Sequence, residues 1–507
     1  MGNSNKKLFR TILISGCAMG IYYIISLVLT PFITENVGVE AYGFVTLSKN
    51  FATYAGMFTI ALNSYAVRYI AISYHRGNIK KSNVYFNSVF WADVLLGIVF
   101  LIVFFVFSLK PEYILNVPSS LITSVKILLA LTGVNFCITT ISTVLGSAAY
   151  IKNRLDLSGI FKGISYVVEA LILIVLFYQF KAEIWYVAIG SIGSTIVILL
   201  SNIFLHKKYV SDLKVRKGDV AASAIRELVI NGVWNSINSL GNILNSGLDI
   251  VVSNLILNPL AMGQVAVVKT ISGIFYALIQ TVSQPFQPIF LKYYSNKDKN
   301  ELIHEFKFSA TICGLFSNLA FAGFFSLGKT FYDMWIPNQN TQLIWELTVI
   351  TLLGCVVEGA IFPLYYVYTL TVKNKIPCMI TVIGGVINVI SKFFLIRFTP
   401  LGIYAIVLTT TVIMTLINFV FNPLYMCHCL SIRKGTFYPV ILKHCFSCFV
   451  MSVVFFVIGK IIKPDNWLSL IISVFVDVII GVFIHMTIQG VGYKKIVSLI
   501  VRRNPHE

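Results

Sequence analysis

Charged residues are scarce in this sequence. Only 12% of its 507 residues are Asp, Glu, Lys or Arg, whereas a soluble protein of this length carries about 25%. Hydrophobic residues make up 57% of the chain and come in long blocks. A single soluble core cannot absorb so much apolar sequence, because such cores stop growing at roughly 250–300 residues. The composition therefore excludes an ordinary soluble globular protein.

Alternating polar and apolar segments of about ten residues, which would indicate membrane-spanning strands, are also missing. The apolar blocks instead run for about 20 residues or more, the length that a helix needs to cross roughly 30 Å of hydrocarbon. We therefore predict an all-α polytopic membrane protein with about fourteen transmembrane helices. The predicted spans are 8–34, 42–74, 84–109, 119–150, 155–180, 183–206, 223–256, 261–294, 303–328, 341–371, 376–398, 402–428, 438–461 and 467–488.

Cysteines and acidic residues are few. The nine cysteines are scattered, mostly inside apolar blocks, which is typical of buried small residues and not of a disulfide framework. Lys and Arg number 39 against 20 acidic residues, for a net charge of +19. In a soluble protein this excess would suggest nucleic acid, but here the basic residues lie between the apolar blocks, so no nucleic-acid partner is expected. We also expect no metal site, no cofactor and no catalytic residue.

The basic residues fall on alternate connections. One set of connections carries basic clusters at 6–10, 76–81, 207–217, 292–299 and 494–503, whereas the other set carries single lysines such as Lys110 and Lys329. Cytoplasmic connections are the ones enriched in Lys and Arg. Both termini are therefore predicted to be cytoplasmic. No outer connection exceeds about a dozen residues, a common connection length that leaves no room for a soluble domain.

The two halves of the chain resemble each other. Residues 41–49 and 261–269 share four residue types at a constant offset of 220, and each segment begins the second span of its half. We therefore predict an N-terminal six-helix lobe at 1–206, a cytoplasmic linker at 207–222, a C-terminal six-helix lobe at 223–428, and two extra helices with a cytoplasmic tail at 429–507. Secondary transporters commonly have such repeats, with the substrate site between them. The alternative is two independent turns rich in small residues. The matched pairs are Ala41 and Ala261, Gly43 and Gly263, Val45 and Val265, Lys49 and Lys269, and Tyr74 and Tyr294.

A polar stripe runs along the seventh span. Its residues are spaced by 4, 3, 4, 3 and 4, which places them on one face of a helix. Polar side chains facing lipid are costly, so this face must meet protein or water. The eighth span carries a similar face with Lys269, Gln280 and Gln284. We predict a hydrated cavity lined by spans 1, 2, 7 and 8; the alternative is hydrogen bonding between helices. The stripe comprises Asn231, Asn235, Asn238, Asn242, Asn245 and Asp249.

Charged residues inside the spans mark functional sites by default. Lys49, Arg68, Asp249 and Lys269 lie on the predicted cavity helices. Two lysines and an arginine favour an anionic ligand, so the predicted substrate-binding residues are these four together with the Asn stripe, Gln280 and Gln284. The remaining charges inside spans are ion pairs, snorkelling side chains or further site residues. They are Asp93, Lys126, Lys162, Glu169, Glu346, Glu358, Lys392 and Asp477.

Three short motifs carry a resemblance to a known family. The chain enters its first span with K-K-L-F-R, continues with I-x-x-x-L-x-P-F around Pro31, and turns with V-G-V-E-A-Y-G at 37–43. With fourteen spans in a 6 + 6 + 2 layout, the whole chain resembles the MOP superfamily of exporters in its polysaccharide-transporter branch. That branch includes the Wzx-type flippases for O-antigen and capsule repeat units, and the lipid II flippase MurJ and the MATE transporters are relatives.

The resemblance implies a substrate and a location. The substrate would be a short oligosaccharide on an undecaprenyl diphosphate carrier, moved across the bacterial cytoplasmic (inner) membrane by two lobes that open alternately to either side. The implied partners are this lipid-linked oligosaccharide, membrane lipids, a coupling ion such as Na⁺ or H⁺, and other polysaccharide assembly proteins. Lys49, Arg68 and Lys269 would attract the diphosphate, and the Asn and Gln side chains would bind sugar hydroxyls.

Two other functions stay open at this point. A MATE-like, cation-coupled drug antiporter would need more acid in its cavity, and Asp249 is the one strong candidate for it. A membrane polysaccharide polymerase or glycosyltransferase would use Glu35 and Glu40 in the first outer loop. The short outer connections argue against such an enzyme, because they leave no platform for a catalytic site.

Overall fold

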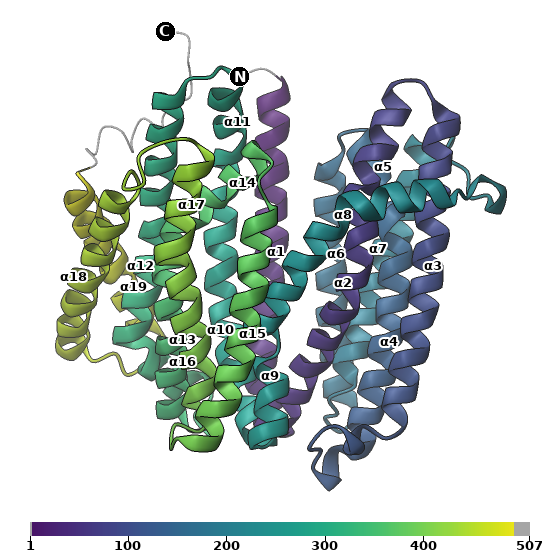
Figure 1. Ribbon diagram of the computed structural model, residues 1–507. Helices are drawn as coiled ribbons and strands as arrows, with labels where there is room; N and C mark the ends of the chain where they lie inside the picture. The colour runs from purple at the N-terminus through teal and green to yellow at the C-terminus, as the bar shows by residue number, and fades with distance from the viewer. Residues whose placement is uncertain (1–2, 491–507) are drawn as a thin grey trace. The chain divides into compact units, whose positions relative to one another are not determined.

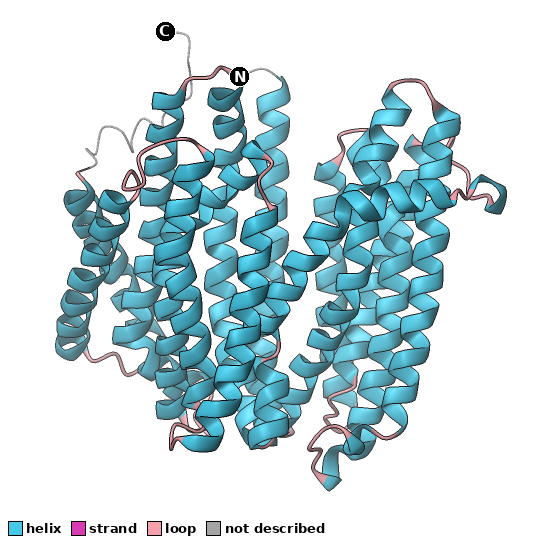
Figure 2. Ribbon diagram, in the orientation of Figure 1, coloured by secondary structure: helices cyan, strands magenta, loops and turns pink. Residues whose placement is uncertain are grey.

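The structure is a computed structural model that describes residues 3–490. Helices joined by short turns make up this part of the chain, and it contains no strand (Figures 1 and 2). The helices form fourteen successive segments, nine continuous and five divided. The continuous ones are α1 (Asn3–Asn36), α2 (Val39–His75), α3 (Ile79–Leu109), α6 (Leu155–Gln179), α7 (Tyr186–Tyr209), α12 (Lys299–Trp335), α15 (Lys375–Phe398), α18 (Tyr438–Ile462) and α19 (Trp467–Gln489). The divided ones are α4 with α5 (Ile122–Leu145, Ser147–Ile151), α8 with α9 (Ala222–Asn242, Asp249–Val252), α10 with α11 (Pro259–Ser283, Gln287–Ser295), α13 with α14 (Thr341–Ile361, Tyr366–Thr371) and α16 with α17 (Tyr404–Leu416, Asn422–Cys429).

These segments match the fourteen predicted spans to within a few residues at most ends. Twelve of the described helices are long and apolar enough to cross a membrane, and the α8–α9 pair, bent by 41°, would be a thirteenth. The remaining segment, α2, is 37 residues long but is not among these thirteen, because Lys49, Asn63 and Arg68 lower its hydropathy. The prediction of an all-α polytopic membrane protein is confirmed.

Helix breaks occur at several of the prolines inside the apolar segments. Pro285 and Pro363 lie in short 3₁₀ turns, and Pro423 is the second residue of α17, which follows a π-helical segment at Ile417–Phe421. Pro31 lies within α1, which continues through it. The bend between α8 and α9 has no proline; a π-helical segment, Ile243–Gly247, precedes it, and a second one, Ser253–Leu257, follows α9. Such π segments frequently occur at functional sites.

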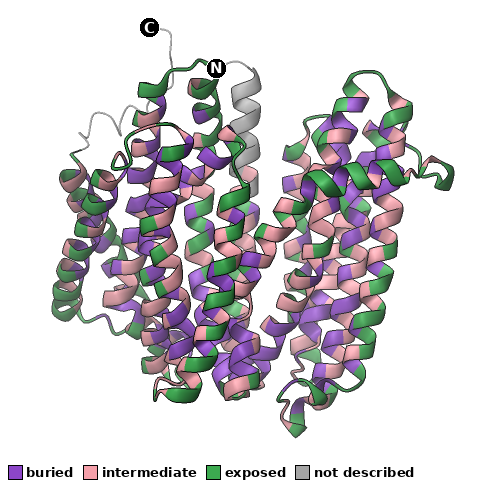
Figure 3. Cartoon of the chain, in the orientation of Figure 1, coloured by how far each residue is buried: buried purple, intermediate pink, exposed green. Residues whose placement is uncertain are grey.

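The chain forms two compact units. Unit 1 comprises residues 1–243 and 250–266, and unit 2 comprises 244–249 and 267–507. Helices of both units carry exposed residues (Figure 3). They include large apolar side chains such as Ile102 and Phe105 on α3 and Phe475 and Ile479 on α19. Such surfaces are suited to contact with lipid. The lobe boundaries deduced from the sequence stay a prediction.

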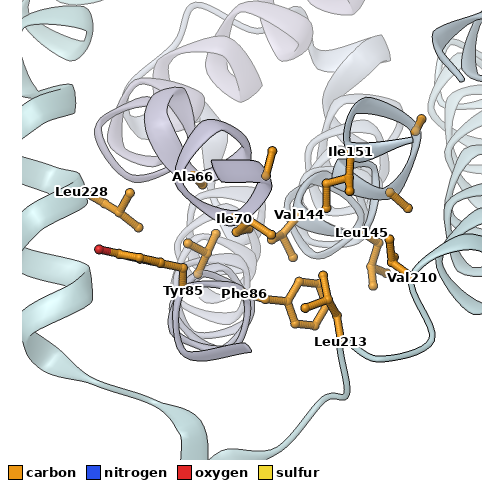
Figure 4. Close-up of a cluster of buried hydrophobic side chains, with 14 of the residues drawn as sticks. Ala66, Ile70, Tyr85, Phe86, Val144, Leu145, Ile151, Val210, Leu213 and Leu228 are labelled. Carbon is orange, nitrogen blue, oxygen red and sulfur yellow. The ribbon is translucent and has the colours of Figure 1, made fainter. Parts of the chain in front are cut away.

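In unit 1, α2 packs against α3, α4 and α8, and α6 packs against α1 and α7. A cluster of buried hydrophobic side chains joins the end of α2 to the beginnings of α3 and α8. Ile70, Phe86 and Leu145 lie inside this cluster, with Leu228 of α8 and Tyr85 at its edge (Figure 4). Leu145 is the last residue of α4, so the cluster fixes the relative positions of several helix ends.

Side-chain amides of α3 form hydrogen bonds with the backbone of the connection between α7 and α8. Asn83 Nδ2 donates to the Asp212 carbonyl (3.0 Å), and its Oδ1 accepts from the Lys214 amide (2.8 Å). Asn87 repeats this arrangement one turn later with the Lys214 carbonyl (2.9 Å) and the Arg216 amide (2.6 Å). The segment predicted as a linker is thus a fixed part of unit 1.

In unit 2, α12 packs against α13, α18 and α19. Polar side chains fasten the last two helices to it. Asn318 of α12 donates to the His444 carbonyl (3.0 Å), and His485 Nε2 donates to the Thr311 carbonyl (3.0 Å). Both histidines are buried, so α18 and α19 are integral to unit 2.

Candidate substrate-binding site

The two repeat-related turns contact each other within unit 1. A Cβ added to Gly43 would lie 2.9 Å from the Gly263 nitrogen and 2.7 Å from the Met262 side chain. Real side chains do not approach so closely, so glycine is required for the two backbones to meet. Ala41, Val45 and their repeat mates are also buried. Packing therefore accounts for the Ala, Gly and Val matches, and the lysine match needs another explanation.

Lys269 is part of a buried ion cluster in unit 2. Its Nζ lies 2.5 Å from Asp249 Oδ2, and the Nζ of Lys392 on α15 pairs with Asp249 Oδ1. Asp249 and Lys392 have no exposed side-chain surface, whereas the Lys269 side chain is 21% exposed. One carboxylate therefore serves two ammonium groups, and only Lys269 reaches the surface of its unit.

The Asn245 carbonyl binds the same cluster from the π-helical segment before Asp249. It accepts hydrogen bonds from Asn388 Nδ2 (2.5 Å), Lys392 Nζ (3.3 Å) and Thr410 Oγ1 (3.1 Å). The Asn245 side-chain amide donates to the Thr381 carbonyl (2.8 Å). A buried charge is tolerated when it is paired and hydrogen-bonded, and these contacts supply both conditions. The cluster retains one positive charge.

The structure divides the predicted Asn stripe into two parts. Asn231, Asn235, Asn238 and Asn242 are exposed on α8, whereas Asn245 and Asp249 are buried in the ion cluster. Asn231 Nδ2 donates to the Tyr69 hydroxyl (3.1 Å) and to the Glu227 carbonyl (2.8 Å). The exposed part can thus offer amide groups to a ligand, and the buried part holds the lysines in place.

The polar face of α10 is exposed beyond Lys269. Tyr276 and Gln280 on α10 are exposed, as is Gln284 in the 3₁₀ turn that follows it. The Tyr276 hydroxyl lies beside the carboxyl of Glu358 on α13. Gln side chains carry both donors and acceptors. Apart from the Glu358 carboxyl, this face combines one cation with neutral hydrogen-bonding groups, an arrangement suited to a ligand with an anionic group and hydroxyls.

Lys49 has surroundings that parallel those of Lys269. It is exposed on α2, with Tyr22, Tyr42 and the carboxyl of Glu169 within electrostatic range. Glu169 is buried on α6, where its Oε1 accepts a hydrogen bond from Ser191 (3.1 Å). Each lysine of the repeat-related pair therefore lies near a buried acid on another helix.

Arg68 does not join Lys49. The two residues lie 19 positions apart on α2, which places them roughly 28 Å apart along the helix axis. Arg68 instead lines a cavity of about 650 Å³ together with Arg76 and Lys81. The structure thus distributes the predicted cations over separate places within the two units.

Sequence reasoning missed the residues that complete the ion cluster. Lys392 is recognisable as a charge inside a span, but neither its partner nor its burial follows from the sequence. Asn388 and Thr410 carry no signal beyond being polar residues in apolar segments. Their positions on α15 and α16 become informative only once these helices are seen to pack against the Asn245–Asp249 segment.

A multi-pass helical bundle with charged side chains buried in its spans is typical of membrane transporters. Residues 8–293, more than half of the chain, match the family described as "Polysaccharide biosynthesis protein". The chain belongs to this family. It is also 29% identical over 448 residues, 88% of each chain, to the membrane protein EpsK of Bacillus subtilis (strain 168).

Solved structures show the same fold. The lipid II flippase MurJ in an inward closed conformation matches 96% of this chain and 100% of its own, with a TM-score of 0.64 and 15% identity. An inward-facing multidrug resistance MATE transporter of the MOP superfamily matches 83% of this chain and 96% of its own, with a TM-score of 0.61 and 12% identity. The resemblance deduced from the sequence motifs is confirmed.

Proposed function

We propose that this protein is a flippase for an undecaprenyl-diphosphate-linked oligosaccharide in the bacterial cytoplasmic membrane. By alternating access, it would deliver repeat units such as those of O-antigen or capsule to the outer face for surface polysaccharide synthesis. The observation that carries the proposal is the sharing of Asp249 by Lys269 and Lys392. This arrangement leaves a net positive charge within the spans of a polysaccharide-family transporter, and a substrate with a diphosphate would supply the missing anion.

Each set of residues has a distinct part in this proposal. Lys49, Lys269 and Arg68 attract the diphosphate, and Asp249 with Asn245 positions Lys269. The exposed amides bind the hydroxyls of the sugars; they belong to Asn231, Asn235, Asn238, Asn242, Gln280 and Gln284. Transport follows only if the substrate binds two conformations with different affinity.

A MATE-like cation antiporter is less well supported. Such a transporter needs a carboxylate that is available to its cation, and here Asp249 is already engaged by two lysines.

A polymerase or glycosyltransferase is also less well supported. Glu35 lies in the last turn of α1 and Glu40 in the first turn of α2, with only residues 37–38 between these helices. A connection of this length is too short to form the binding surface that a catalytic site needs.

The orientation and driving force belong to the same proposal. The basic connections support a cytoplasmic location for both termini. Na⁺ or H⁺ is the candidate coupling ion, and other polysaccharide assembly proteins are the candidate partners.

Deletion of the gene tests the proposal. We expect lipid-linked oligosaccharide to accumulate on the inner leaflet while surface polysaccharide is lost, as measured by extraction of lipid-linked sugars and surface staining. Unchanged levels of both would contradict a flippase and favour the antiporter, which a drug-sensitivity assay would then test. Short surface chains with continued translocation would favour the polymerase.

A further inference from the structure

The polar cavity lined by Arg68 lies in unit 1 and shares no residue with the ion cluster of unit 2. It has a volume of about 650 Å³, within the range of roughly 300–1,000 Å³ found for small-molecule sites. It is formed by the last turns of α2, the connection to α3, the first turns of α3, and α8. These ends carry one of the basic clusters, so the cavity lies on the face predicted to be cytoplasmic.

The charges around this cavity are unbalanced. Arg68, Arg76 and Lys81 line it, and Glu227 is its one acidic lining residue. The surplus of two positive charges matches the charge of about −2 of a diphosphate diester near neutral pH. All three cations are exposed, so their donors are accessible to a ligand.

Hydrogen bonds hold the other lining residues in place. The Tyr85 hydroxyl donates to Glu227 Oε2 (2.6 Å), and Asn231 donates to the Tyr69 hydroxyl (3.1 Å). The rings of Tyr69 and Tyr85 meet edge to face with centroids 5.3 Å apart. Behind them lies the hydrophobic cluster of Figure 4, in which Tyr85 is a boundary residue. The cavity is therefore preformed, which reduces the entropy lost on binding.

We propose that this cavity binds the diphosphate of the lipid-linked substrate before transport, with Arg68 and Arg76 as the principal ligands. The guanidinium group forms paired hydrogen bonds to phosphate oxygens, and Glu227 orients Tyr85 while keeping the net charge close to that of the ligand. The choice of a lipid-linked ligand rests on the proposed flippase function. The site is distinct from Lys49, which lies roughly 28 Å away along α2.

Binding of radiolabelled farnesyl diphosphate, a soluble isoprenoid diphosphate, to the full-length protein in phosphatidylcholine nanodiscs tests the site. We expect inorganic pyrophosphate to compete and farnesol not to compete. Arg68→Gln and Arg76→Gln should each weaken binding roughly tenfold, since a hydrogen bond to a charged group is lost. Lys80→Gln is the matched control: Lys80 is exposed on the same helix end but does not line the cavity, so affinity should not change.

Glu227→Gln is expected to strengthen binding a few-fold, because it removes the one acidic lining residue. A misfolded protein could not produce such a gain. Equal affinity of the wild type and both arginine variants, or an equal loss with Lys80→Gln, would overturn the proposal. Displacement of the probe by phosphatidylglycerol nanodiscs as effectively as by pyrophosphate would also overturn it, because the cavity would then bind any anionic lipid headgroup.

Failure of this inference can be told from failure of the proposed function. Unchanged farnesyl diphosphate binding in the arginine variants, together with accumulation of lipid-linked sugar after gene deletion, would reject the cavity and keep the flippase. Unchanged polysaccharide after deletion would reject the flippase and the assignment of its lipid-linked substrate, whatever the variants bind.

Discussion

Asp249 is the residue on which the charged cluster of unit 2 depends. It is fully buried, and its two oxygens pair with different lysines on α10 and α15. Lys392 is equally buried and has no route to water, whereas Lys269 is partly exposed. Loss of the carboxylate would therefore leave an uncompensated ammonium at Lys392, the costly case for a buried charge.

Asp249→Asn should therefore destabilise the protein by about 3–5 kcal/mol, because it breaks a buried ion pair. Lys392→Met in the Asp249→Asn background should restore part of that stability, since the unpaired ammonium is removed. Unfolding of the purified single and double variants in detergent measures the coupling between the two positions. Simple additivity of the two single changes would show that the pair contributes nothing specific.

A substitution at Gly43 tests the close contact between the two repeat-related turns. Gly43→Ala should destabilise the protein by about 1–3 kcal/mol, because the new methyl group meets the backbone of Gly263 in a packed interior. Gly56→Ala on the same helix is the matched control, since a Cβ there meets no atom within 4 Å. Thermal unfolding compares the two variants. Equal midpoints would mean that the repeat-related turns do not need their glycines.

At the scale of elements, the connection between α7 and α8 differs most from the expectation of a plain linker. Asn83 and Asn87 bind its backbone at four points, and the Ser88 hydroxyl accepts from the Ala221 amide (3.0 Å). The side chains of α3 thus replace the hydrogen bonds that this irregular segment cannot make itself. These hydrogen bonds position the start of α8, the helix that carries the exposed amides.

Asn87→Leu should make the connection between α7 and α8 more mobile, because it removes two of these hydrogen bonds. We expect faster hydrogen exchange of the backbone amides at 212–217, with little change in α4, which provides the reference in the same sample. Exchange at 212–217 that stays at the wild-type rate would show that the connection is held by other contacts.

Hydropathy predicts the elements well and their internal breaks poorly. A helix needs about 20 apolar residues to cross the membrane, so the runs fix the fourteen segments, and prolines mark breaks such as that at Pro363. The divisions at Gly146 and at Ile243–Gly247 have no proline and depend on contacts made after folding. For the same reason the sequence predicts a polar face on α8 but not the burial of Asn245 and Asp249.

In the molecule as a whole, neither of the two compact units is a continuous stretch of the sequence. Residues 250–266 belong to unit 1, and the short segment 244–249, which carries the ligands of Lys392, belongs to unit 2. No sequence pattern indicates this division, because hydropathy shows where the spans are and not which spans pack together. The repeat at 41–49 and 261–269 indicates related halves, and the MurJ and MATE structures share the resulting fold.

We propose that cationic residues in the spans let this protein move a diphosphate-linked oligosaccharide across a membrane. The most direct measurement is transfer of labelled lipid-linked oligosaccharide between leaflets of proteoliposomes that contain the purified protein. We predict transfer by the wild type and by the control Lys329→Ala, whose exposed lysine pairs with Asp333 at 2.8 Å. Lys49→Ala and Lys269→Ala should abolish transfer while leaving membrane insertion intact. Wild-type rates in both of these variants, or no transfer by the wild type, would contradict the account.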